Sequence, residues 1–354
     1  MAILDEVSHI TKDIYLVGTS FESNGFGVPE INKQFFELLH SKSNNIQFLD
    51  IMFQSKHQYP HLSPFLARNI YLIEMRKWIS GKNVHIMHNS DPFTTLPVKD
   101  ISNSARRRIV TVHDFYPFIK QNNGVIESID AKLKKRTYRT IKDYDFVFAR
   151  TAEVKESLEK NHGVDQSKIE IQGPIIEIPL LKNNIKKSSD TCKIGYINNF
   201  NWNKSRMLKK LIELFKQVKD QSLEFHIYGK NFPFLEEITQ DTRIHYHGFL
   251  KDSELSDTLT GLDAYVSTSE YEGFGIPIAK AKAHGIPVLC YDGMIPDVMK
   301  RNTCIWTQSS LPQILENRSW KNVDTRRGLQ DVIPLSPDNV AEQTLKIYGD
   351  VFGF

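Results

Sequence analysis

The segment from Ser267 to Leu289 carries residues whose types and spacing suit the binding of an anionic ligand. It reads Ser-Thr-Ser-Glu-Tyr-Glu-Gly-Phe-Gly-Ile-Pro-Ile-Ala-Lys-Ala-Lys-Ala-His-Gly-Ile-Pro-Val-Leu. We expect a strand to end near Ser267, Pro277 to be a first helical residue and Gly285 to end the helix. A glycine turn leading into a helix N-terminus presents unpaired amides and the positive end of the helix dipole. Glu272, just before the turn, is placed to accept hydrogen bonds from ligand hydroxyl groups.

The elements that must position this segment follow from the alternation of short apolar and longer amphipathic stretches. Strands are predicted at 14–18, 46–51, 84–87, 109–113 and 146–149, and then at 193–196, 224–228, 244–247, 264–267 and 288–291. Helices are predicted at 30–40, 206–219 and 339–354. Most strands are far enough apart for a crossover helix, which predicts parallel sheets covered on both faces.

The segment 174–190 interrupts the pattern with two prolines and a polar run, as a linker does. A chain of 354 residues is also long enough for two domains. We therefore predict one domain over 1–176, with the helix 339–354 packing back on it, and a second over 177–338. Two consecutive α/β domains place the natural ligand site in the cleft between the carboxyl ends of their sheets.

Composition and charge exclude several classes of protein. With 40% hydrophobic and 25% charged residues the chain is globular, and a net charge of +3 argues against a dedicated nucleic-acid binder. Cys192, Cys290 and Cys304 lack the paired spacing of a disulfide framework and suit a reducing compartment. The chain shows neither a signal-peptide pattern nor an apolar run of about 18 residues. We expect a cytoplasmic protein, at most peripheral on the inner face of a membrane.

Several segments occur in the order typical of one enzyme family. The hexapeptide that starts at Glu272 and the following Ala-x-Ala-x-Gly-x-Pro-Val look like a donor-binding signature. Residues 108–117 are similar to a strand that ends in His-Asp, and residues 145–151 to the strand before the linker. Gly248-Phe-Leu and residues 263–269 keep the usual order toward the signature. Together these segments resemble family four of the retaining GT-B glycosyltransferases (glycosyl transferases group one).

The resemblance implies an α/β fold with two Rossmann-like doubly wound domains facing a cleft. It implies transfer of a hexose-type sugar from a nucleotide-sugar donor, bound by the second domain, to a glycan or lipid-linked acceptor on the first. The configuration at the anomeric carbon is retained. The leaving diphosphate itself helps to deprotonate the acceptor in such enzymes, so the resemblance implies no metal and no other cofactor.

The resemblance also assigns roles to individual residues. Glu272 contacts hydroxyls of the transferred sugar, and His113 lies at the reacting centre from the first domain. Lys204 neutralises the diphosphate as it leaves. Gly25 and Gly27 let the first loop approach the donor phosphates or the acceptor. The other predicted donor-side residues are Arg206, Gly248, Gly273, Phe274, Gly275, Ile276 and Lys280.

Two positions depart from the family pattern on the donor side. The family has a second glutamate eight residues after the first to hold the ribose, whereas Lys280 stands there and cannot accept a hydrogen bond. Asn199 stands where an arginine precedes the phosphate lysine, although a shifted alignment lets Arg206 supply that charge. Lys280 could bind the diphosphate near the helix N-terminus instead, or other groups could hold the ribose. The third alternative is a decayed site in a non-catalytic partner of an active transferase.

Other interpretations are weaker. A GT-B epimerase or phosphorylase would need a catalytic carboxylate pattern or a cofactor lysine context that is missing. Asp143-Tyr-Asp145 mimics a metal motif of another glycosyltransferase fold, but it precedes an apolar strand and is interpreted as a loop-to-strand junction. The remaining histidine pairs lack a third ligand at metal-site spacing and are interpreted as structural, namely His85, His88, His245 and His247.

The stretch 132–142 holds six cations and no acidic residue. With the arginines at 106–108 it could bind an anionic membrane surface, which suits a lipid-linked acceptor. A solvated basic face on an amphipathic helix explains the same pattern equally well.

Overall fold

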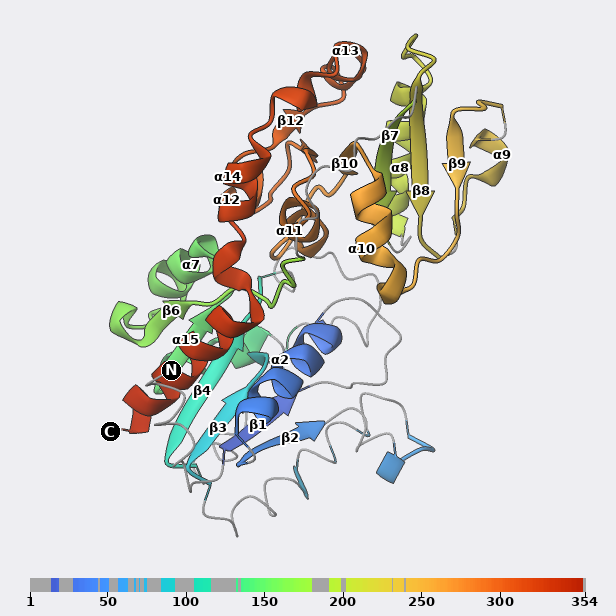
Figure 1. Cartoon of the computed structure of the whole chain (residues 1–354). Coiled ribbons are helices and arrows are strands. Elements are labelled where there is room, and N and C mark those ends of the chain that lie inside the picture. Colours follow the sequence, from blue (N-terminus) through green and yellow to red (C-terminus); the bar gives the residue numbers. More distant parts are fainter. Residues whose placement is uncertain are drawn as a thin grey trace. The chain divides into compact units, whose positions relative to one another are not determined.

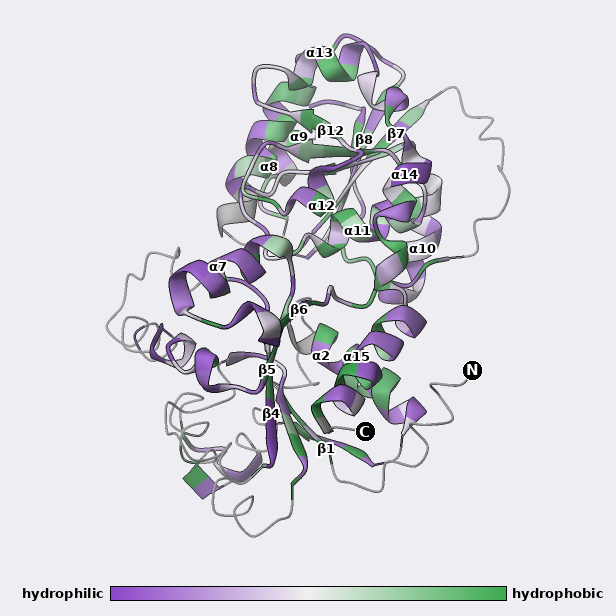
Figure 2. Ribbon diagram, turned by 90° about the vertical axis from the view of Figure 1, so that its left-hand side faces the viewer, coloured by the Kyte–Doolittle hydropathy of each residue, from purple (hydrophilic) through white to green (hydrophobic). Residues whose placement is uncertain are grey.

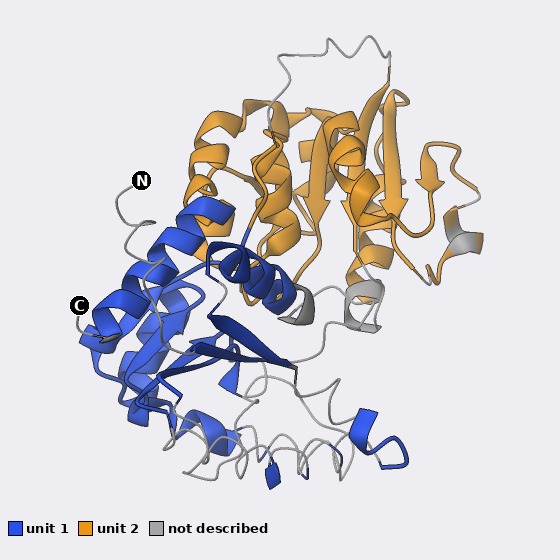
Figure 3. Ribbon diagram, turned by 60° about the horizontal axis from the view of Figure 1, so that its bottom comes forward, with its two compact units in different colours: residues 1–175, 337–354 blue, residues 176–336 orange. Residues whose placement is uncertain are grey.

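The chain forms two compact units, residues 1–175 with 337–354 and residues 176–336 (Figure 3). The structure is a computed structural model. It describes residues 14–18, 28–43, 45–50, 57–62, 67, 70, 73–74, 84–92, 105–115, 132, 135–179, 191–198, 202–230, 232–238 and 240–352. Over these residues, each unit forms a six-stranded sheet.

The sheet of unit 1 has the strand order β2-β1-β3-β4-β5-β6, and every pairing is parallel (Figure 1). Its strands are β1 (Ile14–Gly18), β2 (Ile46–Asp50), β3 (Ile86–Asn89), β4 (Arg107–Val112), β5 (Phe146–Ala149) and β6 (Ile169–Ile171). Among its described residues the helices are α2 (Val28–Lys42), η3 (Ile141–Asp143), α7 (Ala152–His162), η4 (Gln166–Lys168) and α15 (Pro337–Phe352). The order reverses direction between β1 and β3.

Helices cover both faces of this sheet because its strands are apolar on both sides. On one face α2 and α15 lie side by side, and Leu39 and Leu345 share a core with Ile14. On the other face α7 contributes Val154 and Leu158. The rest of α7 is hydrophilic, as Figure 2 shows. This helix therefore packs through a narrow stripe and leaves its remaining surface to solvent.

The last described helix, α15, follows unit 2 in sequence but belongs to unit 1. The Tyr348 hydroxyl hydrogen-bonds His88 Nδ1 at 2.7 Å, and Gln172 Nε2 donates to Thr344 Oγ1 at 2.7 Å. Since both contacts are buried, α15 is an integral part of the unit 1 core.

The sheet of unit 2 has the order β12-β11-β10-β7-β8-β9, again parallel throughout. Its strands are β7 (Cys192–Ile197), β8 (Leu223–Tyr228), β9 (Ile244–Tyr246), β10 (Ala264–Ser267), β11 (Val288–Tyr291) and β12 (Cys304–Trp306). Its helices are α8 (Trp202–Phe215), α9 (Leu235–Ile238), α10 (Asp252–Gly261), α11 (Ile276–Ala283), α12 (Asp297–Lys300), α13 (Leu311–Glu316), η5 (Ser319–Asn322), α14 (Thr325–Gln330) and η6 (Ile333–Leu335).

Two hydrophobic cores hold these helices to the sheet. Leu208 and Leu211 of α8 pack with Phe225 and Trp320 in one core. Ile278 of α11 and neighbouring alanines form the other core. The strand order reverses between β7 and β10, the place where open α/β sheets bind ligands at their carboxyl ends.

The predicted α/β class with two doubly wound sheets is confirmed. Boundaries differ in places: α8 begins at Trp202, four residues earlier than predicted, and ends at Phe215. The sequence pattern did not reveal β6 or β12, which have only three residues each. Each is a short edge strand with an exposed isoleucine, Ile171 or Ile305, so it shows no continuous apolar run and forms because a neighbouring strand pairs with it.

Candidate functional site

The loop between β10 and α11, which holds the predicted sugar-contacting carboxylate, has a defined conformation. The amide of Glu272 donates to the carbonyl oxygen of Met294 at 3.1 Å, and the Met294 amide donates to the Glu270 carbonyl oxygen at 2.8 Å. A Cβ at Gly293 would approach the carbonyl oxygens of Ser269 and Glu270 to 2.8 and 2.7 Å. Glycine at 293 therefore allows the two segments to lie this close.

The Glu272 side chain is half-buried and oriented by a neighbour in its own loop. Ser269 Oγ donates to Glu272 Oε1 at 2.5 Å. Ser269 itself is buried, so its hydroxyl has a restricted position. Ser269 is not among the residues predicted from the sequence, although it stands three residues before a predicted site carboxylate.

The turn into α11 depends on Gly275. This residue has φ of +96° and is the N-cap of the helix, and a Cβ there would lie 3.2 Å from Met299 Cγ. The helix begins at Ile276, so Pro277 occupies its second position, where the sequence predicted the first. The difference of one residue is small because the first-turn amides have no helical partner in either case.

The first turns of α8 reach the same loop. Arg206 donates to both carboxylate oxygens of Glu270, at 2.8 and 2.6 Å. This exposed ion pair links α8, which follows β7, to the loop that follows β10, on either side of the point where the strand order reverses. The backbone of Lys204 is helical in the first turn of α8, and Asn199 lies outside the described residues.

Lys280 lies on the accessible face of α11. It is half-buried, as are Ile276 and Pro277, and its ammonium group makes no hydrogen bond or ion pair with any residue that the structure describes. Lys282, two positions later, is buried and donates to Asp331 Oδ2 at 3.0 Å and to two carbonyl oxygens. Of these two lysines, only Lys280 is available to a ligand.

The predicted donor-side glycines and Phe274 of unit 2 lie in loops that follow strands. Gly273 and Phe274 are half-buried in the β10–α11 loop. Gly248 follows β9 with φ of +77°, and its carbonyl oxygen accepts from the Gly229 amide at 2.7 Å. This bond joins the carboxyl ends of β8 and β9.

In unit 1 the carboxyl ends of four neighbouring strands converge on His113. His113 follows β4, and its Nε2 donates to the carbonyl oxygen of Ser90 after β3 at 2.7 Å. Arg150, directly after β5, donates from Nε to His113 Nδ1 at 3.3 Å. The Arg150 Nη1 also donates to the carbonyl oxygens of Gln172 and Gly173, after β6, at 3.2 and 3.0 Å. The ring of His113 is thereby fixed in orientation and tautomer.

These surroundings keep His113 neutral. Burial, and then the charge of Arg150, lower the pKa of His113 from 6.5 to about 3 despite the opposing hydrogen bond to Ser90. A proton carrier at neutral pH needs a pKa nearer 7 and a free ring nitrogen. The arrangement therefore suits a fixed neutral ring, not a general base. Arg150 was not predicted as the partner of His113, although a cation directly after a predicted strand was a visible signal.

The two patterns that mimic metal sites in unit 1 have structural partners. Asp145 accepts from the Arg108 amide at 2.8 Å, at the junction into β5. His88 is buried, with Nδ1 bonded to Tyr348 and Nε2 bonded to Thr111 Oγ1 at 2.8 Å. Gly25 and Gly27 lie outside the described residues.

Comparison with known proteins gives a family for the second unit. The family described as "Glycosyl transferases group 1" matches residues 178–309. The O-antigen chain mannosyltransferase B of Escherichia coli is 30% identical over 122 residues, which are 32% of this chain and 32% of that protein. Unit 2 belongs to the glycosyl transferases group 1 family. This membership confirms the resemblance predicted from the sequence.

Solved structures match the fold of nearly the whole chain, unit 1 as well as the group 1 domain. Sucrose-phosphate synthase from Thermosynechococcus elongatus matches with a TM-score of 0.72 at 13% identity, over 96% of this chain and 99% of that one. Anabaena Alr3699/HepE, solved in complex with UDP and glucose, matches with a TM-score of 0.67 at 13% identity, over 96% and 100%. The predicted GT-B fold is confirmed by these matches and the two parallel sheets.

In the group 1 domain most of the predicted donor-side residues lie around the β10–α11 loop. Glu272, Gly275 and Lys280 lie in or after the β10–α11 loop, and Arg206 touches that loop from α8. Gly248 lies apart from them, beyond β9, the edge strand of the order. Across the described residues, no helix is long and apolar enough to span a membrane.

Proposed function

We propose that this protein is a retaining glycosyltransferase that moves a hexose-type sugar from a nucleotide-sugar donor to a glycan or lipid-linked acceptor. The observation that carries the proposal is the Glu272 carboxylate, held by Ser269 in the β10–α11 loop of a group 1 domain. That loop lies at the reversal of strand order, where open α/β sheets bind nucleotides.

The charges around this loop suit a sugar diphosphate. Glu272 accepts hydrogen bonds from sugar hydroxyls, and the N-terminus of α11 and Lys280 offer positive potential to the diphosphate. Lys204 and Arg206, in the first turns of α8, complete the set of cations. Because the leaving group is stabilised by these charges, the transfer that we propose needs neither a metal nor another cofactor.

The nature of the donor is suggested by the relatives. Anabaena Alr3699/HepE was solved with UDP and glucose, and the Escherichia coli relative is a mannosyltransferase. We therefore propose a nucleoside diphosphate hexose, and a first panel should contain UDP-glucose and GDP-mannose.

His113 serves as a fixed neutral group on the acceptor-side unit. Its ring is oriented by Ser90 and Arg150, and its neutral state avoids a second positive charge beside Arg150. In this proposal it contacts the transferred sugar at the reacting centre, and the acceptor proton goes to the leaving diphosphate.

An anionic membrane surface is a further proposed partner. Within 132–142 the described cations are exposed, namely Lys132, Lys135, Arg136, Arg139 and Lys142. Each exposed cation contributes about 1 kcal/mol to binding anionic lipid. The double variant Lys135→Glu/Arg139→Glu should lose flotation with anionic vesicles at low salt, whereas Lys321→Glu/Lys346→Glu should keep it. Wild-type protein that does not float would exclude the membrane.

Ligand-induced thermal stabilisation tests the donor site directly. A nucleotide sugar that binds the folded state raises the melting temperature. The active donor should then support transfer, with an anomeric configuration in the product equal to that of the donor by NMR. Glu272→Gln, which keeps the shape of the side chain, should lower turnover at least about 100-fold with an unchanged melting temperature. Glu236→Gln, an exposed change in the same unit, is the control, and full activity of Glu272→Gln would refute the assignment.

A non-catalytic partner subunit is the second candidate, and Lys280 is the observation that favours it. If Lys280 binds the diphosphate, Lys280→Glu should weaken nucleotide binding about tenfold by charge repulsion. If the donor site has decayed through loss of a ribose-binding carboxylate, the same change should restore or strengthen binding. The sign of the change in affinity, measured by calorimetry, separates the two candidates.

A further inference from the structure

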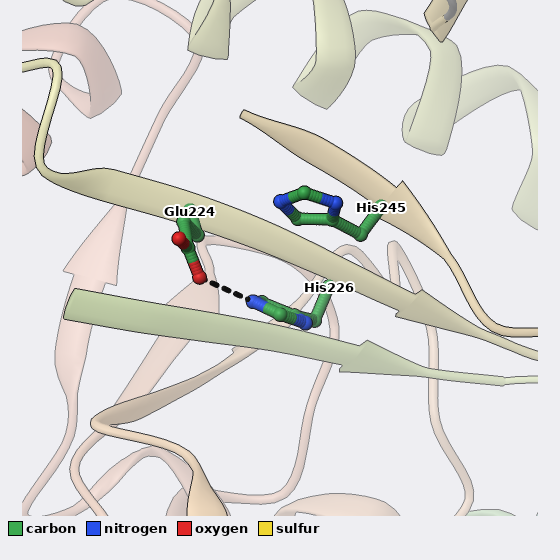
Figure 4. A group of neighbouring side chains, drawn as sticks. All are labelled: Glu224, His226 and His245. Atoms are coloured by element: carbon green, nitrogen blue, oxygen red, sulfur yellow. Dashed lines mark hydrogen bonds and ion pairs between the residues drawn. The ribbon is translucent and has the colours of Figure 1, made fainter. Parts of the chain in front are cut away.

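Strands β8 and β9 carry metal-ligating side chains on one face. Glu224 and His226 are two residues apart on β8, so they point to the same side of the sheet. His245 of β9 is paired in register with His226. Phe225, between the two β8 residues, points to the opposite face and is buried in the core against α8. Figure 4 shows the three polar side chains side by side.

The spacing of these side chains suits one metal ion. One ligand atom from each of Glu224, His226 and His245 lies within 4.8 Å of the others. The hydrogen bond between His226 Nε2 and Glu224 Oε2 is 3.0 Å long. A tetrahedral zinc ion with bonds of about 2.1 Å places its ligand atoms roughly 3.4 Å apart. Small side-chain rotations therefore bring the three groups to coordination distance.

A second layer of contacts orients His226. Its Nδ1 lies 2.9 Å from Nε2 of His247, and the two rings are stacked with centroids 5.1 Å apart. His247 is stacked in turn on Tyr228, with centroids 4.5 Å apart. A hydrogen bond on the far ring nitrogen is the usual way in which a protein fixes a ligating histidine.

We propose that Glu224, His226 and His245 form a zinc-binding site. Two imidazoles and one carboxylate are a donor set that zinc prefers, with water completing four-coordination. Zinc would take the place of the proton between His226 Nε2 and Glu224.

The metal would join an edge strand to the rest of unit 2. Among the described strands β9 is last in the order and has three residues, so few hydrogen bonds hold it. Glu224 lies near the amino end of β8, whereas the proposed donor-binding loops follow the carboxyl ends of β7 and β10. The site is therefore separate from transfer chemistry and serves stability.

Sequence spacing did not reveal this group. The interpretation of His245 as structural rested on the absence of a third ligand nearby in the sequence. The parallel pairing of β8 with β9 supplies that ligand, since it places His226 and His245, 19 residues apart in the sequence, beside each other.

The experiment measures zinc binding to the metal-free full chain by equilibrium dialysis, with cobalt absorption as a second readout. We expect one zinc per chain, a visible cobalt band of a four-coordinate site, and a melting temperature several degrees higher with zinc. His245→Ala and Glu224→Gln should each weaken zinc at least about tenfold, because each removes one ligand. His284→Ala, which changes a half-buried histidine elsewhere in unit 2, should bind zinc as the wild type does.

Misfolding of the ligand variants would also lower zinc binding, so a variant that is expected to bind zinc more tightly gives an independent test. Lys193 of β7 pairs in register with Glu224, so its positive charge belongs to the same face of the sheet and opposes the binding of a cation there. Lys193→Met should therefore tighten zinc binding several-fold. Equal zinc binding in wild type, His245→Ala and Glu224→Gln, or no binding in wild type and Lys193→Met, would overturn the proposal.

Discussion

At the scale of single residues, the candidate site depends on side chains that orient other side chains. Ser269 holds Glu272, Arg206 holds Glu270, and Arg150 holds His113. Hydrogen bonds to charged groups are among the stronger ones in proteins, so each orienting residue should affect function through its partner.

Removing the Ser269 hydroxyl should lower the rate of transfer without unfolding the protein. Ser269→Ala frees the Glu272 carboxylate, and a bond to a charged group contributes about 1.5–3 kcal/mol, so kcat should fall about tenfold or more. Ser269→Thr keeps a hydroxyl and should recover most of the rate. Steady-state kinetics with the donor that the thermal-stabilisation panel selects provide the measurement, and an unchanged kcat in Ser269→Ala would contradict the positioning role.

Lys282 offers a comparison of two lysines on one helix. Lys282→Met removes the ammonium group that pairs with Asp331 in a mostly buried site, where Asn302 Nδ2 still donates to Asp331 Oδ2 at 2.9 Å. The change should cost about 3–5 kcal/mol of unfolding free energy. Lys280→Met, at an accessible position, should change it by less than about 0.5 kcal/mol. Urea unfolding of both variants tests this, and equal effects would show that the Lys282 ion pair contributes little.

The sequence revealed the residues of the site better than their partners. Glu272 and Gly275 stand in a short local motif, so a turn and a helix start were enough to find them. Arg150 and Ser269 act through contacts that depend on where strands end in space, as does the pairing of His226 with His245. Such contacts have no fixed spacing in the sequence and could not be predicted from it.

At the scale of elements, too, local patterns could be predicted from the sequence and long-range pairing could not. Strands such as β1, β5, β10 and β11 were predicted to the residue because they are continuous apolar runs. In contrast, β6 and β12 are short and partly exposed, and they exist through pairing with β5 and β11. The amphipathic pattern of the sequence predicted helix α15. It did not predict the buried hydrogen bonds that α15 makes with the rest of unit 1.

The buried hydrogen bond between Tyr348 of α15 and His88 can be removed by deleting one hydroxyl group. Tyr348→Phe removes the hydroxyl that bonds His88 and leaves a buried ring nitrogen without that partner, which should cost about 1–3 kcal/mol. Tyr291→Phe is a matched control, since the Tyr291 hydroxyl has no hydrogen bond with the described residues, and should change stability by less than about 0.5 kcal/mol. Chemical denaturation measures both free energies of unfolding. An unchanged stability of Tyr348→Phe would show that this hydrogen bond does not hold α15 to unit 1.

At the scale of the whole molecule, unit 1 contains a buried histidine, His88, and a half-buried one, His113, which should make it sensitive to acid. Burial, followed by the charge of Arg150, lowers the pKa values of His88 and His113 to about 3. In the unfolded chain both titrate near 6.5, so between these values the unfolded state binds more protons than the folded state. Their stabilising effect is therefore complete above about pH 6.5 and is lost as the pH falls toward 3.

Unfolding measured at pH of about 7, 6 and 5 should show this loss, at up to about 1.4 kcal/mol per pH unit for each histidine. His88→Gln should be less stable at neutral pH but lose less on acidification. Hydrogen exchange that resolves the two units should assign the histidine-dependent part of the loss to unit 1. An equal pH slope for wild type and His88→Gln would contradict the assignment.

The return of α15 to unit 1 has a consequence for synthesis on the ribosome. Unit 2 is continuous in sequence, so all of its residues have been synthesised before the first residue of α15 is added. Unit 1 lacks Leu345 and Tyr348 of its core until that moment. The nascent chain therefore completes its second unit before its first. During that interval, the apolar face of α2 and the β1–β3 region that α15 will cover is exposed, and it is the part of the growing chain most in need of a chaperone.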